Sequence, residues 1–245
     1  MMKKNAFICC LLIVFACSSS VFAQKVTEPF NGKNLDGWKK VRPQENFIWR
    51  VGIPSLAKED SREFRFVPLE DMTKSAALVN LSGAEWGPNG LFRGADICTE
   101  QTFGDCTLEI EFMLAKGANS GIYLMGEYEV QVLDSWGKTG KLNQGDVGAI
   151  YSAAEPKLNA SKEPGKWQKF VIEFQAPRFD AAGNKTANAK FLKITLNDQV
   201  VQENVEVTKG STGGGVTGGE MAKGPLMLQG NHGPVAFRNI VITEK

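Results

Sequence analysis

Carboxylate and amide side chains alternate with apolar side chains in one short segment, residues 127–132. The polar positions are Glu127, Glu129 and Gln131. Because side chains two positions apart share a face in a β-strand, we expect these groups on one face and the apolar residues on the core face. A glutamate in the middle of a strand is costly to bury without a partner, so this face is expected to line a wet, polar concavity. The alternative is an ordinary sheet whose polar face is open to solvent.

A second carboxylate, Asp134, follows this segment. It is an odd number of positions from Glu129, so a regular strand would direct it to the opposite face. One β-bulge near residues 132–133 would bring it back beside Glu129 and Gln131, and bulges are frequent next to active sites. The pattern would then present two carboxylates and an amide from one strand.

The only histidine, His232, lies in a turn bounded by glycine and proline between two expected strands. An imidazole at such a turn can project, which makes it a candidate for acid–base catalysis or for polarising a carbonyl group. A surface histidine that hydrogen-bonds the turn is an equally weighted alternative. Trp136 directly follows the acidic strand and could stack on a sugar ring, whereas Trp38, Trp49 and Trp167 are assigned to packing.

A glycine-rich run occupies residues 210–219. It lacks the lysine and the following helix of a phosphate-binding loop. We therefore expect a flexible surface connection with no chemical role, the alternative being a mobile loop near the mouth of a cleft.

The elements that must position these residues are short strands separated by turns, with no convincing amphipathic helix. Strands are expected on both sides of Gly126 and at 47–51, 76–81, 90–92, 106–114, 147–151, 166–174, 189–196, 199–205, 226–229 and 235–242. Residues 52–75 are irregular and charged, and they are expected to form a surface excursion. This organisation predicts an all-β sandwich of two antiparallel sheets in one domain, residues 24–245.

The N-terminus predicts export. Two lysines, an apolar run over residues 6–17 and small residues ending at Ala23 form a secretory signal peptide, residues 1–23. The apolar run is too short to span a membrane, so no transmembrane segment is expected. Cleavage after Ala23 is preferred and gives a periplasmic or secreted protein. The alternative is an outer-membrane lipoprotein attached through Cys17.

Removing this leader changes the charge balance from 28 basic and 27 acidic residues to 26 and 27, because it takes Lys3 and Lys4 with no acids. A chain so close to neutral has no electrostatic reason to bind nucleic acid or an anionic membrane, and a neutral sugar is a better partner. Of the five cysteines only Cys98 and Cys106 remain. A disulfide could persist in an oxidising compartment, but two buried thiols packed in the core are preferred.

The sequence resembles two known families. The pattern Glu-x-Gln-x-x-Asp resembles the Glu-x-Asp-x-x-Glu strand of laminarinase-like retaining glucanases, with Gln131 and Asp134 in place of two of the acids. Over nearly the whole mature chain, the sequence resembles the 3-keto-disaccharide hydrolase domain family. The matching blocks are Phe30-Asn-Gly-Lys-Asn-Leu-Asp-Gly-Trp38, Asn119-Ser-Gly-Ile-Tyr-Leu124, Tyr128-Glu-Val-Gln-Val-Leu-Asp-Ser135, 148–151, 159–161, 164–167, 176–180 and Gln229-Gly-Asn-His-Gly-Pro-Val-Ala-Phe-Arg-Asn-Ile240.

This family resemblance implies a concanavalin-like jelly roll and action on glycosides oxidised to a ketone at C3. Such a ketone acidifies the C2 proton, so a base can remove it, the aglycone can leave from C1, and water can then add. On this basis Glu129 is expected to be the base, Asp134 the acid, and His232 the enolate stabiliser or a second acid, with Gln131 as an orienting group. Further substrate contacts are expected from Tyr123, Trp136, Asn119, Gln229 and Arg238.

Two other functions fit the same residues. A retaining glycoside hydrolase of unmodified β-glucans would use Glu129 as nucleophile and Asp134 as acid/base, with the carboxyl groups about 5–5.5 Å apart. A carbohydrate-binding module would bind sugar without catalysis. The sequence shows no clustered metal ligands, so no metal and no cofactor are expected.

Overall fold

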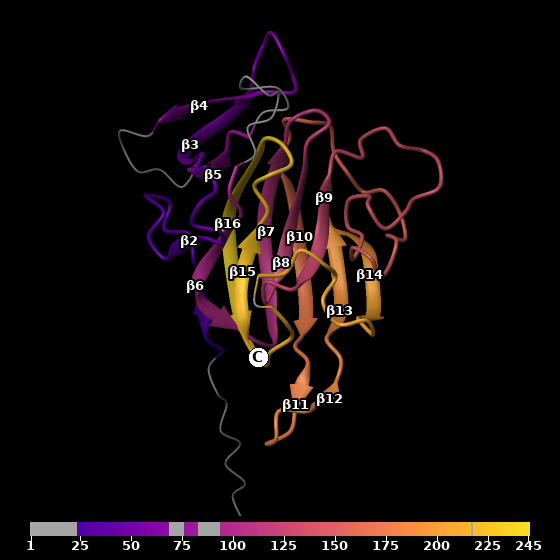
Figure 1. The fold of residues 1–245 in the computed structure, drawn as a ribbon. Helices are drawn as coiled ribbons and strands as arrows, with labels where there is room; N and C mark the ends of the chain where they lie inside the picture. The colour runs from indigo at the N-terminus through magenta and orange to yellow at the C-terminus, as the bar shows by residue number, and fades with distance from the viewer. Residues whose placement is uncertain (1–23, 69–75, 83–93, 217) are drawn as a thin grey trace, which may run out of the picture.

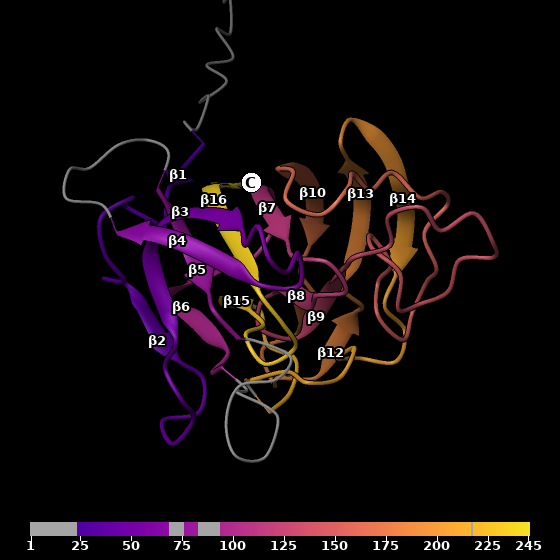
Figure 2. The ribbon, with the colours of Figure 1, turned by 90° about the horizontal axis from the view of Figure 1, so that it is seen from above.

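The computed structural model describes residues 24–68, 76–82, 94–216 and 218–245. The expected leader (1–23) and the short strand expected at 90–92 lie outside these residues. The described chain folds into antiparallel strands that form two layers (Figures 1 and 2). None of the described segments forms a helix that could span a membrane.

The larger layer is a nine-stranded sheet. Its strands are β1 (Val26–Thr27), β3 (Trp49–Leu56), β4 (Phe64–Pro68), β5 (Ala77–Asn80), β7 (Cys106–Leu114), β10 (Gln168–Gln175), β13 (Lys190–Leu196), β14 (Gln199–Glu206) and β16 (Val235–Glu244). Their order is β14–β13–β10–β7–β16–β5–β3–β4, and β1 pairs with β16.

The smaller layer is a five-stranded sheet that carries the acidic segment. Its strands are β2 (Trp38–Lys40), β6 (Ile97–Phe103), β8 (Asn119–Leu124), β9 (Tyr128–Leu133) and β15 (Gly224–Leu228). Their order is β2–β6–β15–β8–β9, so β9 is an edge strand. In Figure 1 this sheet lies in front of the larger one, and the separate hairpin of β11 (Arg178–Phe179) and β12 (Lys185–Ala187) projects below.

The core between the layers fixes the register of β9. Tyr128, Val130 and Val132 are fully buried in the main hydrophobic cluster, and the Tyr128 ring lies 5.4 Å from the Phe174 ring of β10. Burying side chains of this size contributes roughly 1.5–3 kcal/mol each. A slip by one residue would exchange these side chains for the acids, so the apolar face holds Glu129 on the opposite side of the sheet.

The all-β sandwich of two antiparallel sheets predicted from the sequence is confirmed. The strand predicted at 106–114 coincides with β7, and most of the others differ only at their ends. The surface excursion predicted for 52–75 is wrong over 52–68, because β3 continues to Leu56 and pairs with β4 from Gly52↔Pro68 to Leu56↔Phe64. Val67 in this outer hairpin is exposed, and Phe64 and Phe66 are only partly buried, so the alternation in β4 is weak.

Two smaller corrections concern the segments around the acidic strand. Residues 97–103 were not among the expected strands, but they form β6, which pairs with both β2 and β15. Residues 147–151 were expected to be a strand, but Ile150 forms only two isolated bridges, with Val130 and with Ala154. Cys98 and Cys106 are free and buried in different clusters, which confirms the preferred interpretation of two packed thiols.

Candidate active site

Tyr123 and Glu129 are direct neighbours across the β8–β9 pair. The same row continues to Met227 in β15 and then to Cys98 in β6. Tyr123, Met227 and Cys98 form a small cluster of their own, separate from the main core. The row therefore lies on the face of the smaller sheet that points away from the larger one.

A second row on this face contains a glycine that makes room for the glutamate. Gly121 pairs with Gln131, and its carbonyl oxygen accepts the Gln229 N–H at 3.0 Å. A Cβ on Gly121 would lie only 2.3 Å from Oε1 of Glu129. The Glu129 carboxylate therefore leans over Gly121, into space that any other residue would fill.

Glu129 has the properties of a general base that works near neutral pH. It is only 4% exposed. Burial raises the pKa of Glu129 to about 7, a hydrogen bond with Tyr123 opposes this rise, and the charge of Asp96 adds to it. Burial also raises the pKa of the Tyr123 phenol, and the Gln229 amide donates to its oxygen at 3.4 Å. A buried carboxyl group with such a pKa is suited to accepting a proton.

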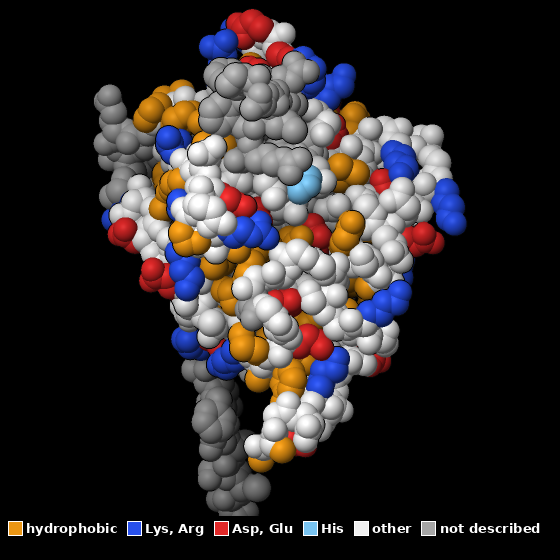
Figure 3. Space-filling view, in the orientation of Figure 1, with side chains coloured by type: hydrophobic (Ala, Val, Ile, Leu, Met, Phe, Trp, Pro, Cys, Tyr) orange, Lys and Arg blue, Asp and Glu red, His pale blue; other side chains and the backbone are white. Residues whose placement is uncertain are grey.

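Asp96 interacts with both Glu129 and His232. It is buried, its Oδ1 accepts the Gly230 N–H at 2.8 Å, and burial is the main cause that raises its pKa. Positive charge at His232 lowers the pKa of Asp96, while Asp96 itself raises that of Glu129. The exposed His232 is pale blue in Figure 3, on the face of the molecule that carries the smaller sheet. Asp96 thus interacts electrostatically with both candidate proton carriers.

The outer edge of β9 is covered by residues 211–216, which we call the strap. Thr212 is buried, and its hydroxyl group accepts the Glu129 N–H at 2.8 Å and donates to the Glu127 carbonyl oxygen at 3.2 Å. The Thr212 N–H also donates to the Glu127 carbonyl oxygen, at 3.1 Å, and the Val216 N–H donates to that of Gly126 at 2.9 Å. The strap therefore completes the hydrogen bonding of this edge at the candidate base.

Two glycines allow the strap to lie close to the side chains of Glu127 and Tyr123. A Cβ on Gly215 would lie 2.1 Å from Oε2 of Glu127, and one on Gly214 would lie 3.0 Å from the Tyr123 hydroxyl oxygen. Gly214 also has a φ of +73°, which side chains rarely allow. The expected flexible surface connection without a role is wrong for these residues, because they pack against the site.

Asp134 occupies a different position from the one expected. The β8–β9 pairing runs without a shift from Leu124↔Tyr128 to Asn119↔Leu133, so the predicted bulge near 132–133 is wrong. The Asp134 carboxylate accepts the Gly117 N–H at 2.8 Å and the Trp136 N–H at 3.3 Å. Backbone donors of the turns at the end of the sheet thus hold this second acid.

Gln131 and Asn119 share the face of Glu129. Gln131 is buried, and its Oε1 accepts the Val132 N–H at 3.2 Å. Oδ1 of Asn119 is buried and accepts no hydrogen bond from any residue that the structure describes. A buried, unsatisfied acceptor is costly, so Asn119 offers a place for a donor group from a ligand.

Trp136 and Arg238 lie apart from this group. Trp136 is 57% exposed and borders a hollow of about 470 Å³ that it shares with Trp167 and charged residues of the 162–166 loop. Arg238, in β16 of the larger sheet, stacks on Trp167 at 4.0 Å and donates from Nε to Glu111 at 2.7 Å. The structure therefore groups these two predicted contacts around Trp167.

Sequence reasoning missed three residues of the site, Asp96, Thr212 and Tyr151. Tyr151 donates its N–H to the Glu129 carbonyl oxygen at 3.1 Å, which extends the row of Tyr123 and Glu129 by one residue. Asp96 precedes β6, a strand that was not predicted, and Thr212 lies in a low-complexity run. Of the three residues, only Tyr151 lay in a segment with a recognisable pattern, the alternation around Ile150, and this pattern was interpreted as a strand.

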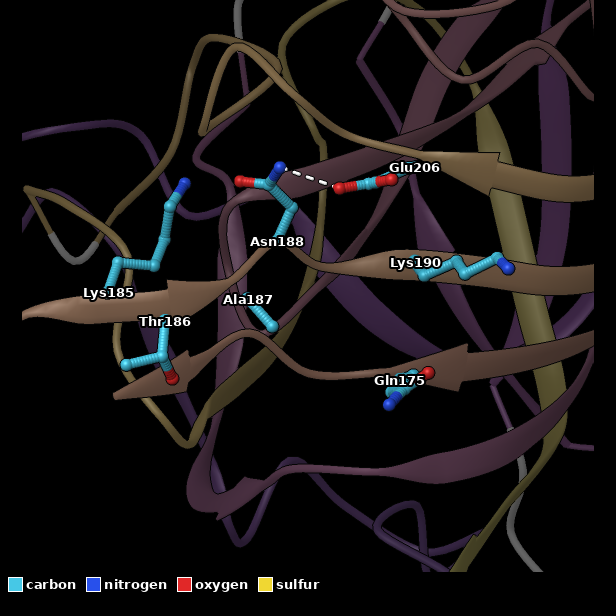
Figure 4. Close-up of a pocket in the computed structure, with 7 residues that line it drawn as sticks. All are labelled: Gln175, Lys185, Thr186, Ala187, Asn188, Lys190 and Glu206. Carbon is cyan, nitrogen blue, oxygen red and sulfur yellow. Dashed lines mark hydrogen bonds between the residues drawn. The ribbon is translucent and has the colours of Figure 1, made fainter. Parts of the chain in front are cut away.

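Another hollow lies away from Glu129. It measures about 500 Å³, between the β11–β12 hairpin and the ends of β10, β13 and β14. Figure 4 shows the Asn188 amide bonded to Glu206 (2.7 Å), while Lys185 and Lys190 point in different directions. Its polar groups do not converge on one point, so we place the chemistry at Glu129.

Comparison with known proteins shows the family to which the chain belongs. A family described as the 3-keto-alpha-glucoside-1,2-lyase-like domain matches residues 25–243. A crystal structure from Parabacteroides distasonis ATCC 8503, provisionally described as a glycosyl hydrolase, is 26% identical, with a TM-score of 0.62 over 90% of this chain and 84% of that one. A second protein of that organism with the same description shares the fold at 18% identity and a TM-score of 0.55, over 90% and 94% of the two chains.

A search of curated proteins found no match. The family match spans nearly all of the described chain and includes β8 and β9, the strand that carries Glu129. The chain therefore belongs to the 3-keto-alpha-glucoside-1,2-lyase-like domain family.

Proposed function

We propose that this protein is an exported enzyme that cleaves glycosides oxidised to a ketone at C3 of the sugar, and that Glu129 is its general base. The family and the glycosyl hydrolase description of a relative support a glycoside substrate. The observation that carries the assignment is the buried Glu129 carboxyl group, whose pKa is raised to about 7 beside a neutral Tyr123 phenol.

The first step removes the C2 proton. The Glu129 carboxylate accepts this proton, and the electrons of the C2–H bond form the enolate of the C3 ketone. A base whose pKa lies near the working pH combines a large ionised fraction with useful basicity. Tyr123 orients the carboxylate through their hydrogen bond, and Gln229 in turn donates to Tyr123.

The second step expels the leaving group. The enolate electrons form a C1–C2 double bond, the C1–O bond breaks, and the departing oxygen takes a proton. Water then adds its hydroxyl group to C1 and a proton to C2, which releases the 3-keto sugar. We assign the enolate stabilisation or the protonation of the leaving group to His232, which interacts with Asp96 on the same face.

Asp134 is not assigned the acid role, because two backbone N–H groups already hold its carboxylate. Gln131 and Asn119 are assigned to substrate binding, since both lie on the face of Glu129 and Asn119 has an acceptor available. The N-terminal basic and apolar segment supports export.

Turnover assays test the proposal. The purified protein and a Glu129→Gln variant are incubated with 3-keto-trehalose, a 3-keto-β-glucoside and an unoxidised β-glucan, and the products are followed by NMR. We expect release of the leaving group from a 3-keto substrate and at least a ~10³-fold loss in the variant. Cleavage of the unoxidised glucan would establish the direct hydrolase instead, and sugar binding without any turnover would establish a binding module.

A further inference from the structure

A polar groove adjoins the candidate base on the outer side of β9. Two hollows of about 320 and 460 Å³ share Gln144, Tyr151 and Ser152, and we call this continuous surface the Tyr151 groove. The first hollow also reaches Thr212, whose hydroxyl group accepts the Glu129 N–H. Sites for small ligands typically measure ~300–1,000 Å³. The groove therefore has the size of a ligand site and begins beside the base.

Tyr151 is placed at the junction of the groove and the site. The bridge between Val130 and Ile150 aligns Tyr151 with Glu129, so both belong to the row that contains Tyr123. An electrostatic interaction between the Tyr151 and Tyr123 phenols agrees with this arrangement. Tyr151 is nevertheless 42% exposed, so much of its side chain is open to the groove.

The backbone that carries Tyr151 is held firmly. Ser152 has a φ of +59°, which is unusual for a residue other than glycine. The Gln202 amide donates at 3.1 Å to the carbonyl oxygens of Gly148 and of Glu155, on both sides of the turn. Such a turn presents the tyrosine in a preformed position, which lowers the entropic cost of binding.

The chemistry of the groove suits a sugar ring. Its shared residues provide an aromatic ring, a carboxamide and a hydroxyl group, and the strap adds the hydroxyl group of Ser211. Aromatic rings offer a flat apolar surface to the C–H face of a sugar, while amides and hydroxyl groups both donate and accept hydrogen bonds. The lining also includes Glu155, Glu206 and Lys209, whose charged groups can hydrogen-bond hydroxyl groups as well. The groove thus suits a polyhydroxylated ring.

We propose that the Tyr151 groove is the subsite for the leaving group, and that it binds a second sugar residue with its ring stacked on Tyr151 and its hydroxyl groups bonded to Gln144 and Ser152. This inference rests on the proposed function, because it requires cleavage at Glu129. It places the ketone-bearing sugar of a disaccharide over Glu129 and the other sugar in the groove.

Two substrates that differ only in their leaving group distinguish a loss of binding in this subsite from a loss in the catalytic step. The Tyr151→Ala and Gln144→Ala variants are assayed on 3-keto-trehalose and on a methyl 3-keto-glucoside, whose leaving group is too small to reach the groove. We expect kcat/KM for the disaccharide to fall roughly 5- to 50-fold, with that for the methyl glycoside within about twofold. Tyr151→Phe keeps the ring and should retain most of the disaccharide activity, and Phe47→Ala serves as an exposed aromatic control.

Equal losses on both substrates, or no loss on either, would overturn the proposal. Binding provides a second readout that does not require turnover. Unoxidised disaccharide is titrated by NMR into Glu129→Gln and into the same variant with Tyr151→Ala, after thermal unfolding has shown that both are folded. We expect the second substitution to weaken binding at least fivefold, and unchanged binding would overturn the subsite. Loss of binding without turnover of any 3-keto substrate would reject the proposed reaction but keep the sugar site.

Discussion

At the scale of single residues, the account depends on how the protein raises the basicity of the Glu129 carboxylate. Burial favours the neutral form, Asp96 adds electrostatic repulsion, and Tyr123 partly restores the charged form through a hydrogen bond. These opposing causes set the pKa of Glu129 to about 7. The sequence revealed Glu129 through strand alternation, but it could not reveal Asp96, because their interaction depends on the pairing of distant strands.

The pH dependence of turnover should report this group. If Glu129 acts as a carboxylate, kcat/KM should rise with pH and level off above about 7. Tyr123→Phe removes the hydrogen bond that lowers the pKa of Glu129, so the rise should move to higher pH. Profiles of both proteins on one 3-keto-glucoside measure this shift, and a shift to lower pH would contradict the assigned interaction.

Stability should depend on pH through the same residue. Between pH 4.5 and about 7 the unfolded chain releases the Glu129 proton while the folded chain keeps it, so stability is lost as pH rises through this range. The raised pKa corresponds to a loss on the order of 3 kcal/mol. The Glu129→Gln variant lacks this loss. Denaturant unfolding should therefore show that the stability of the variant relative to the wild type is greater at pH 8 than at pH 4. A constant difference between the two proteins would contradict the raised pKa.

Gly121 should be as important as the base itself. Gly121→Ala would put a Cβ 2.3 Å from the present position of Glu129 Oε1, so the carboxylate must move. A displacement of this size is expected to lower kcat at least ~100-fold. Gly140→Ala is the matched control, since Gly140 has open space around its α-carbon and should tolerate the change. Equal activities of the two variants would show that the position of Glu129 over Gly121 does not matter.

At the scale of elements, the strap is the feature that local sequence could not predict. Its glycines indicate conformational freedom, but their function here is close approach to Glu127 and Tyr123, which only the fold reveals. The prediction of a bulge was wrong because it considered β9 alone, whereas the regular pairing of β9 with β8 continues to the end of the strand. Strands with a clear buried face, such as β7, were predictable, whereas the outer hairpin of β3 and β4 was not.

Thr212→Val tests the strap. It keeps the shape of the side chain but removes the acceptor for the Glu129 N–H and the donor to the Glu127 carbonyl oxygen. We expect a loss of about 1–3 kcal/mol in the free energy of unfolding and faster hydrogen exchange at the Glu129 amide. Thr212→Ser keeps the hydroxyl group and should preserve the slow exchange. If Thr212→Val left the exchange of this amide unchanged, the strap would not hold the edge of β9.

At the scale of the whole molecule, the sandwich separates stability from chemistry. One face of the smaller sheet packs on the larger sheet, and the other carries Tyr123, Glu129 and Gln131. The core face was predictable from alternation alone, and it also gave the correct face for the acids. The residues of the candidate site that come from other strands and loops were not predictable, because only the three-dimensional pairing of the strands brings them together.

The most direct test of the central claim is the fate of the hydrogen at C2. The protein is incubated with a 3-keto-glucoside in D₂O, and the released 3-keto sugar is examined by NMR at once, with an enzyme-free sample to correct for spontaneous exchange. Elimination followed by hydration predicts deuterium at C2 of the product, and Glu129→Gln should abolish product formation together with C2 exchange. Release of a sugar that retains its original C2 hydrogen would contradict proton removal by Glu129.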